Sequence, residues 1–309
     1  MSGKLAAGIV AFRSDPDLLL PLVRRLAGET TALFVFVNGP MERETLQALR
    51  GTPAAIIESQ YNLGVGEALN QLVLHAIVAG FTRLAVFDDD SCLPAGAIAK
   101  LARTMDELEA AGEKPAVVGP RIVSPAAASE TYRPPRYFEV RGKTHDAARG
   151  VRYVITSGSL INLDVFRHVG RFRSDFFIDA IDTEWCFRVW RRGYSCWADR
   201  SIEMEHRIGA GVTRRTILGR GFPKQPPMRL YAYVRNQVYC LRLPHLPLWW
   251  RGLLGAHLVR LCGAHWLDAQ DKREMRRLLA SAVGDGMAGR LGPPAQAQDV
   301  ARIDAGARG

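Results

Sequence analysis

Short apolar runs alternate with segments of helical periodicity through the first half of this chain. A run of four to eight apolar residues has the length of a buried strand, and a helix between successive runs allows the strands to lie parallel. The alternation therefore predicts an α/β fold of βαβ units, with a mostly parallel sheet flanked by helices. The expected strands are 6–12, 32–37, 54–58, 83–87, 116–118, 159–162 and 201–204, and the expected helices are 17–27, 66–79, 95–111, 164–169 and 182–192.

The rest of the chain differs in composition. Residues 124–150 are rich in Ala, Pro, Arg and Gly without a clear period, which predicts a long loop, and regular structure is expected to resume at 151–155. From about residue 216 the sequence becomes basic and helical, and its end is rich in Ala, Gly, Pro and Gln. We therefore expect a main α/β domain over 1–215, a basic helical extension over 216–292 and a disordered tail over 293–309.

Composition limits the class of protein. With 309 residues, 48% of them hydrophobic and 23% charged, the chain has the make-up of an ordinary globular protein with a sizeable core. The first apolar run is cut short by Arg13 and Asp15, so it predicts a strand and not a secretion signal. The five cysteines, at 92, 186, 196, 240 and 262, form no CxxC pair, and a reducing cytoplasm is the expected compartment.

The chain carries 41 basic and 31 acidic residues, a formal net charge of +10. Such an excess favours polyanions, which include nucleotides, anionic lipid surfaces and nucleic acid. The segment 246–254 mixes Leu and Trp with flanking arginines and suits the interface of a membrane. It cannot form an ordinary transmembrane helix, because Arg251, His257 and Arg260 interrupt the apolar run of about 20 residues that is needed. A helical hairpin that packs on the main domain is an equally good interpretation.

Three consecutive carboxylates, Asp88, Asp89 and Asp90, follow the apolar run 84–87. Open α/β sheets bind ligands at the carboxyl ends of their strands, and clustered carboxylates are costly unless a cation neutralises them. Mg²⁺ or Mn²⁺ prefers such oxygen ligands and commonly bridges them to substrate phosphates. The alternative is a solvated acidic turn in which Ser91 caps a helix.

Two further polar clusters follow expected strands. Asn62 and Gly64 stand in a loop before the helix that carries Asn70, a place that can receive an anion or the edge of a nucleotide, although Asn62 also suits a local cap. Asp179 and Asp182 precede or begin a helix in which Glu184 and Arg188 stand four residues apart and can pair. One of these carboxylates suits a general base if the fold brings it near the aspartate triplet, and Asp182 also suits a helix cap.

Five segments follow one another along the chain and together resemble glycosyltransferase family two, most closely its bacterial rhamnosyltransferase branch. They are Asn62-Leu63-Gly64 with Asn70, Phe87 to Ser91, Ile155 to Leu160, Phe177 to Asp179, and Asp182 to Arg188. The resemblance covers about residues 5 to 245, and the Thr-Ser-Gly-Ser and Asp-Thr-Glu-Trp segments are its most specific parts. The segment 283–292 also resembles the end of such enzymes.

The resemblance implies a GT-A fold, whose sheet is Rossmann-like and mixed but mostly parallel, and an inverting transfer from a nucleotide-activated sugar, with Mn²⁺ or Mg²⁺ as cofactor. It assigns the metal to Asp88, Asp90 and His206, and the proton-accepting role to Asp182. It implies that the nucleotide sugar is bound by Phe12, Arg13, Asn38, Asn62, Gly64, Asn70 and Asp89. It also implies that the donor or acceptor sugar meets Ser157, Gly158, Asp179 and Trp185, where Trp185 either stacks on a sugar or anchors the core.

Rhamnose from dTDP-rhamnose is the donor that the resemblance favours, with galactofuranose from UDP-galactofuranose as the alternative. The expected acceptor is a glycan or a lipid-linked sugar of a surface polysaccharide, reached in the cytoplasm at the inner face of the membrane. Phe12-Arg13 replaces the usual Tyr-Asn, and Asn38-Gly39 replaces a pair that contains Asp. Two remoter alternatives are a phosphatase of the haloacid dehalogenase type, and a basic nucleic-acid-binding module, for which the sequence offers no recognised motif.

Overall fold

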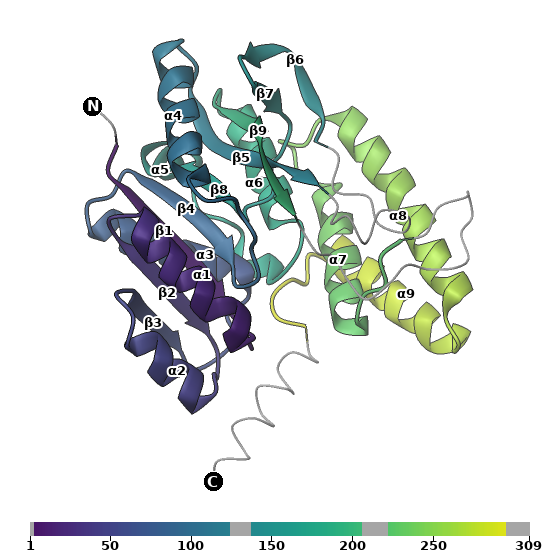
Figure 1. Cartoon of the computed structure of the whole chain (residues 1–309). Coiled ribbons are helices and arrows are strands. Elements are labelled where there is room, and N and C mark those ends of the chain that lie inside the picture. The colour runs from purple at the N-terminus through teal and green to yellow at the C-terminus, as the bar shows by residue number, and fades with distance from the viewer. Residues whose placement is uncertain (1–2, 124–136, 206–221, 295–309) are drawn as a thin grey trace.

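The computed structural model describes residues 3–123, 137–205 and 222–294, and Figure 1 shows its arrangement. A nine-stranded sheet runs through the molecule, with helices on both faces and a helical C-terminal region at one side. The strands are β1 Leu5–Ala11, β2 Leu33–Asn38, β3 Ala55–Ser59, β4 Arg83–Asp88, β5 Pro115–Val123, β6 Glu139–His145, β7 Ala148–Val151, β8 Ser159–Asn162 and β9 Ser195–Glu205. The helices are α1 Pro16–Glu29, α2 Arg43–Arg50, α3 Val65–Val78, α4 Ala97–Ala110, α5 Leu163–Val169, α6 Ile181–Arg191, α7 Pro227–Cys240, α8 Leu248–Asp268 and α9 Lys272–Ala288.

The order of the strands is β3-β2-β1-β4-β8-β5-β9-β7-β6. The first four strands in sequence are parallel, and β5 is parallel to β9. The short strand β8 is inserted between β4 and β5 and runs antiparallel to both. Because the parallel strands end at one edge, the segments that follow β1, β2 and β4 meet there, and the start of β8 joins them.

The apolar runs form strands because both faces of the sheet are covered. One core cluster packs α3, α5, α6 and α7 against one face, and a second packs α1, α2 and α4 against the other. Side chains of β1 and β2 are buried almost throughout, as expected for parallel strands between two helical layers. The predicted fold class is confirmed.

The C-terminal helices are part of the same body. Leu230 and Val234 of α7, Leu254 of α8 and Leu279 of α9 belong to the core cluster that also holds Trp185. The extension therefore packs on the main domain, as the hairpin interpretation expected. Within the described residues, no helix combines the length and the apolar character required to cross a lipid bilayer.

Some predictions about local structure were wrong. Residues 139–150 were predicted as part of a loop, but together with Val151 they form the hairpin β6–β7, which extends the sheet beside β9. Most of β6 is exposed, so its sequence lacks the apolar alternation of a half-buried strand. The structure also has a short helix, α2, that was not predicted, and no regular strand over 152–155. Residues 124–136, the boundary near 216 and most of the predicted tail lie outside the described residues.

Candidate active site

The aspartate triplet lies where β4 ends, beside the start of β8. Asp88 is the last residue of β4, and its backbone N–H lies within hydrogen-bonding distance of the hydroxyl groups of Ser91 (2.9 Å) and Ser157 (3.4 Å). The two hydroxyl groups are 2.6 Å apart, and the backbone N–H of Gly158 donates to the carbonyl of Val86 at 2.8 Å. The antiparallel insertion of β8 thus brings the predicted residues Ser157 and Gly158 against the triplet.

The end of β1 lies against the second carboxylate of the triplet. Asp89 Oδ2 accepts a hydrogen bond from the hydroxyl of Ser14 and is 3.4 Å from the backbone nitrogen of Phe12. The Phe12 ring is exposed and lies 5.5 Å from the guanidinium carbon of Arg13. Arg13 has a backbone φ of 50°, which is unusual for a side chain of its size. The predicted residues Phe12 and Arg13 therefore adjoin the triplet, and Ser14 joins them without having been predicted.

The side chains of Asn38 and Asn62 are hydrogen-bonded to each other. Asn38 Nδ2 donates to Asn62 Oδ1 at 3.1 Å, while Asn38 Oδ1 accepts from the backbone of Leu63 at 2.8 Å. Asn62 Oδ1 also accepts from the backbone of Gly64 at 2.8 Å. These hydrogen bonds fix the loop before α3. The contacts of Asn62 are those expected of a local cap, and both asparagines shape the wall of the site.

Asn70 makes its side-chain hydrogen bonds within the protein. It is 3% exposed, and its side-chain amide binds both the carbonyl (3.0 Å) and the N–H (2.9 Å) of Phe172. This pair of bonds fastens α3 to a segment 102 residues later in the chain. Both polar atoms of the side chain thus have partners within the protein, and the expected contact of Asn70 with the nucleotide stays a prediction.

Asp179 and Asp182 lie in and just after a tight turn that leads into α6. Phe177, Asp179 and Ala180 all have positive φ values, of 66°, 63° and 65°. Such backbone angles are unfavourable for residues other than glycine and persist only where surrounding contacts hold them. Asp182 stands in the first turn of α6 and its Oδ1 accepts from the backbone of Thr183 at 2.8 Å. Strain of this kind clusters at functional sites, and here it precedes the predicted base.

Arg229 of α7 is a site residue that was not predicted. Its Nε and Nη2 atoms donate to the two carboxylate oxygens of Asp179 at 3.2 and 3.1 Å. The negative charges of Asp179 and, to a smaller extent, Asp88 raise the pKa of Arg229. The C-terminal extension thus supplies a cation to the space between the triplet and α6.

The carboxylates of the site are coupled electrostatically. The pKa of Asp88 is raised to about 7, first by burial and then by the negative charges of Asp90, Asp89 and, to a smaller extent, Asp182. Burial also raises the pKa of Asp182 to about 6, with a contribution from Asp179. Because charges influence one another in this way only at short range, β4 and α6 place their carboxylates around one space. A cluster with raised pKa values favours protons or a bound cation.

A cavity of about 340 Å³ adjoins the triplet on the side of α1. Asp90, Ser91, Cys92 and Glu205 line its polar side, and Glu205 forms an isolated backbone bridge with Cys92. The predicted strand 201–204 is confirmed as part of β9, which ends at Glu205. His206, the predicted third metal ligand, lies outside the described residues.

Among the described residues, one group of three metal-binding side chains has its ligand atoms within 4.8 Å of one another: Glu107, His145 and Asp146. Glu107 is in the last turn of α4, whereas the triplet precedes the start of that helix, so this group is separate from the triplet. At the triplet, Asp88 and Asp90 supply hard carboxylate oxygens. A cation that is held partly by substrate phosphates needs only one or two such protein ligands.

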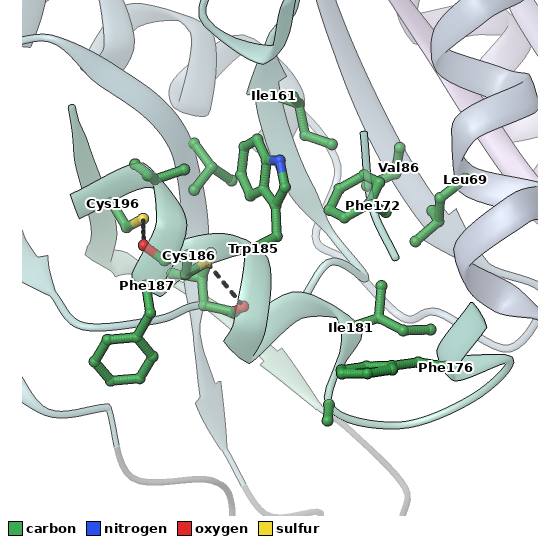
Figure 2. Close-up of a cluster of buried hydrophobic side chains, with 14 of the residues drawn as sticks. Leu69, Val86, Ile161, Phe172, Phe176, Ile181, Trp185, Cys186, Phe187 and Cys196 are labelled. Atoms are coloured by element: carbon green, nitrogen blue, oxygen red, sulfur yellow. Dashed lines mark hydrogen bonds between the residues drawn. The ribbon is translucent and has the colours of Figure 1, made fainter. Parts of the chain in front are cut away.

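Trp185 anchors the core and does not face the site. It is 1% exposed, its Nε1 donates to the carbonyl of Gly170 at 2.9 Å, and its ring packs on those of Phe166 and Phe172. Figure 2 shows it surrounded by apolar side chains of several elements. The structure therefore supports the interpretation in which Trp185 anchors the core and contradicts the one in which its ring stacks on a sugar.

Glu184 is also structural. It is buried, with Arg188 Nη2 2.8 Å and His245 Nε2 2.9 Å from its carboxylate oxygens. The predicted pair of Glu184 and Arg188 is therefore confirmed. Since both of its oxygens are engaged, Glu184 is a poor candidate for a general base, and Asp182 is the better one.

Comparisons with known proteins agree with this geometry. No family model matches the chain. It is similar to the dTDP-rhamnosyl transferase RfbF of Shigella flexneri, with 30% identity over 194 residues, which cover 60% of this chain and 62% of the relative. The chain thus matches less than two thirds of that relative's length. The predicted likeness to rhamnosyltransferases is confirmed.

Solved structures show the same fold. TarS 1-349 of S. aureus, in complex with UDP-GlcNAc, superposes with a TM-score of 0.56 at 13% identity, over 95% of this chain and 82% of TarS 1-349. GalNAc-T7, with UDP, GalNAc and Mn²⁺, gives a TM-score of 0.52 at 11% identity, over 91% of this chain and 57% of the other. The chain therefore has the GT-A fold predicted from its sequence.

Proposed function

We propose that this chain is an inverting, metal-dependent glycosyltransferase. It moves a sugar, first of all rhamnose from dTDP-rhamnose, to a glycan or lipid-linked acceptor during synthesis of a surface polysaccharide, in the cytoplasm. The observation that carries the proposal is the coupling of Asp88 at the end of β4 to Asp182 at the start of α6, around one space. The GT-A fold and the likeness to a dTDP-rhamnosyl transferase support it.

Asp88 and Asp90 are the residues that would hold Mn²⁺ or Mg²⁺. A divalent cation bound there supplies Lewis-acid stabilisation of the negative charge on the departing diphosphate. The raised pKa of Asp88 supports this assignment, because a cation would relieve the repulsion among the three carboxylates. The charge on the leaving group then needs no second carboxylic acid to protonate it, in contrast to glycoside hydrolysis.

Asp182 accepts the proton of the acceptor hydroxyl. With a pKa of about 6 it is largely ionised at neutral pH and is still a stronger base than an ordinary carboxylate. The acceptor oxygen attacks the anomeric carbon on the face opposite to the departing diphosphate, and this direct displacement inverts the configuration. Asp179, held by Arg229, keeps a second negative charge beside Asp182 and contributes to its raised pKa.

The donor lies across the ends of β1, β2 and β4. Asp89, fixed by Ser14 and the backbone of Phe12, faces its ribose or sugar, and the exposed Phe12 ring lies beside the base. Asn38 and Asn62 shape the adjacent wall through the hydrogen bonds that fix their loop. Ser157 and Gly158 border the sugar from the start of β8.

UDP-galactofuranose is the alternative donor. The observation that favours a uracil nucleotide is that the similar structures of TarS and GalNAc-T7 contain UDP-GlcNAc and UDP. The phosphatase and nucleic-acid alternatives are disfavoured, because the aspartate triplet follows the fourth strand of a GT-A fold and Asp89 is turned to the end of β1.

A binding and turnover experiment tests the proposal. Melting temperatures are measured with dTDP and UDP, with and without Mn²⁺, and a panel of nucleotide sugars is then assayed for donor hydrolysis and transfer. We expect a metal-dependent rise with one nucleotide, and we expect Asp182→Asn to retain that rise while losing turnover. Asp164→Asn, on the exposed first turn of α5, is the matched control. If no nucleotide raises the melting temperature with metal present, or if Asp182→Asn turns over normally, the proposal is wrong.

A further inference from the structure

Helix α8 is apolar on the side that faces the protein and on the side that faces solvent. Leu254, Leu258 and Leu261 are buried in the core. On the opposite side, large apolar side chains are exposed along the whole helix. They are Leu248 (79% exposed), Trp249 (45%), Leu253 (50%), Val259 (69%) and Trp266 (42%). A helix that is apolar all round is normally buried on every side, so this exposure calls for a partner.

These exposed residues form one continuous stripe, which we name the outer face of α8. At about 100° per residue they lie within an arc of roughly 140°, with Gly252, Ala256 and Gly263 between them. Arg260 is the one charged residue within this arc, and it is only partly exposed. The Arg260 guanidinium packs over the ring of Phe222, and Arg251, which lies outside the arc, donates to the carbonyls of Leu243 and Leu246. From Leu248 to Trp266 the outer face is roughly 27 Å long at 1.5 Å per residue.

The outer face continues onto the hairpin β6–β7. Phe138, just before β6, is also exposed, and its ring centroid lies 6.5 Å from that of Trp249 and 5.3 Å from that of Trp250. Figure 1 shows α8 on the side of the molecule away from α1 and α2. Aromatic rings thus stand at both ends of the outer face, with aliphatic and small residues between them.

The charge of the chain is concentrated around this helix in sequence. Between Glu205 and Asp268 there is no acidic residue and there are ten basic ones, which equals the whole excess of +10. The remainder of the chain is therefore neutral in formal charge. The ten basic residues are Arg207, Arg214, Arg215, Arg220, Lys224, Arg229, Arg235, Arg242, Arg251 and Arg260. A partner of this region has to combine an apolar layer with negative charge.

We propose that the outer face of α8 is the surface by which this protein lies on an anionic lipid bilayer. Aliphatic side chains enter the boundary between headgroups and acyl chains, while Trp249 and Trp266 lie at the depth of the headgroups, which indole rings prefer. The excess of positive charge in the sequence that carries α8 favours anionic headgroups. A second copy of the chain fits less well, because it would bring two such segments together, and nucleic acid would leave the aliphatic stripe unburied.

The same surface lies close to the proposed active site. The Trp250 ring packs on Tyr153, with centroids 5.8 Å apart, and the charge of Asp182 contributes to the raised pKa of the Tyr153 phenol. Burial is the larger cause of that rise. A short aromatic path therefore joins the outer face of α8 to the surroundings of the proposed base. Docking in this way brings the bilayer surface near the acceptor side of the site.

Flotation of the full chain with lipid vesicles tests this proposal. Vesicles of phosphatidylcholine alone are compared with vesicles that also contain phosphatidylglycerol. The test variant is Leu253→Gln with Val259→Gln, at two positions that are half or more exposed and outside the site. The matched control is Leu74→Gln with Val78→Gln on α3, where the side chains are 49% and 79% exposed. Circular dichroism and melting temperatures establish that each variant is folded.

We expect the unmodified chain to float with the anionic vesicles and to bind them less as salt is raised. The test variant should lose roughly tenfold or more in affinity, since two aliphatic side chains no longer enter the lipid, while the control binds as the unmodified chain does. Equal binding by the two double variants, or equal binding to both kinds of vesicle, contradicts the proposal. Sedimentation equilibrium that shows a dimer, dissociated by the test variant, would assign the outer face of α8 to a second copy instead.

Discussion

The side-chain amide of Asn236 donates a hydrogen bond of 2.7 Å to the carbonyl oxygen of Ile178, 58 residues earlier in the chain. The same nitrogen lies 2.9 Å from the carbonyl of Phe176 and 3.3 Å from that of Asp179, and Asn236 is fully buried. One side chain of α7 therefore holds the turn whose positive φ values lead into α6 and Asp182. The C-terminal extension positions the proposed base.

Replacement of Asn236 by leucine should show whether this side chain positions Asp182 or only fills space in the core. The change leaves buried carbonyl groups without their donor, and we expect it to cost about 2–3 kcal/mol in the free energy of unfolding. We also expect turnover to fall more than tenfold. The affinity for the nucleotide should be kept, because the residues proposed to bind the nucleotide sugar are untouched. Urea unfolding and steady-state kinetics measure the two effects. Gln71→Leu, on α3, is the control, and normal turnover in folded Asn236→Leu protein would contradict the positioning role.

Gly64 also contacts the turn that precedes α6, at Phe177. It has a φ of 80°, and a Cβ atom added there would lie 2.5 Å from the carbonyl oxygen of Phe177. Gly64→Ala should therefore destabilise the protein by about 2–4 kcal/mol, through strain and a clash with backbone. Gly80 has nearly the same φ, 81°, but open space around it, so Gly80→Ala should cost only about 1 kcal/mol. Thermal and urea unfolding of the two variants gives the comparison, and equal losses would show that the contact with Phe177 is unimportant.

The pKa of Asp182, raised to about 6, predicts the pH dependence of transfer. The carboxylate accepts a proton only when it is ionised, so kcat/KM should fall about tenfold per pH unit below the pKa. Because the charge of Asp179 contributes to the rise, Asp179→Asn should move the midpoint to lower pH. The pH–rate profiles of the two proteins test this, with Asp164→Asn as control. An unchanged or higher midpoint in Asp179→Asn would be inconsistent with the proposed coupling.

Asp88 should reduce the stability of the metal-free protein at neutral pH. Its pKa is about 7 in the folded chain and close to 3.8 when unfolded. Between these values the folded state binds more protons, so stability falls as pH rises. Asp88→Asn should therefore be more stable than the unmodified chain at pH 8, by about 1–2 kcal/mol after allowance for partial exposure, with the difference vanishing near pH 4.

Addition of Mn²⁺ gives a second test of the role of Asp88. The ion should raise the melting temperature of the unmodified chain at pH 8, because it neutralises the carboxylates, and should have little effect on Asp88→Asn. Calorimetric scans over a series of pH values, with Mn²⁺ or with a chelator, record both quantities. If Asp88→Asn is less stable than the unmodified chain at pH 8, ionised Asp88 does not destabilise the metal-free protein and the prediction is wrong.

Trp185 should affect stability without affecting catalysis. Trp185→Phe removes the hydrogen bond to Gly170 and part of a buried ring, and we expect a loss of about 2–4 kcal/mol in the free energy of unfolding. Turnover at a temperature where the variant is folded should stay within about twofold, since the indole has no contact with the site. A specific rise in acceptor KM would restore a role in binding sugar.

The strands were predictable because both of their faces are buried, so that runs such as 84–87 are apolar at every position. The hairpin β6–β7 was not, because β6 is mostly exposed and is paired at the rim of the sheet. The resemblance in sequence led to Asp88, Asp89 and Asp182, which stand in local motifs. Arg229 and Asn236 stand in none, and their contacts lie 50 and 58 residues away. Such pairs depend on how α7 packs, which no short pattern encodes.

The antiparallel strand β8 lies in the sheet between the first four strands in sequence and the strands β5, β9, β7 and β6, which leaves the molecule in two parts. Apart from Ser157 and Gly158, which border the sugar, the residues proposed to hold the donor precede residue 91, and those proposed on the acceptor side follow residue 150. Among the contacts that join these parts, two seams lie beside the proposed site: the register of β8 against β4, and the contact of Gly64 with Phe177. A chimera joined within α4 that preserves both seams would combine the nucleotide-sugar preference of one enzyme with the acceptor of another, so new linkages can arise by recombination without any new catalytic residue.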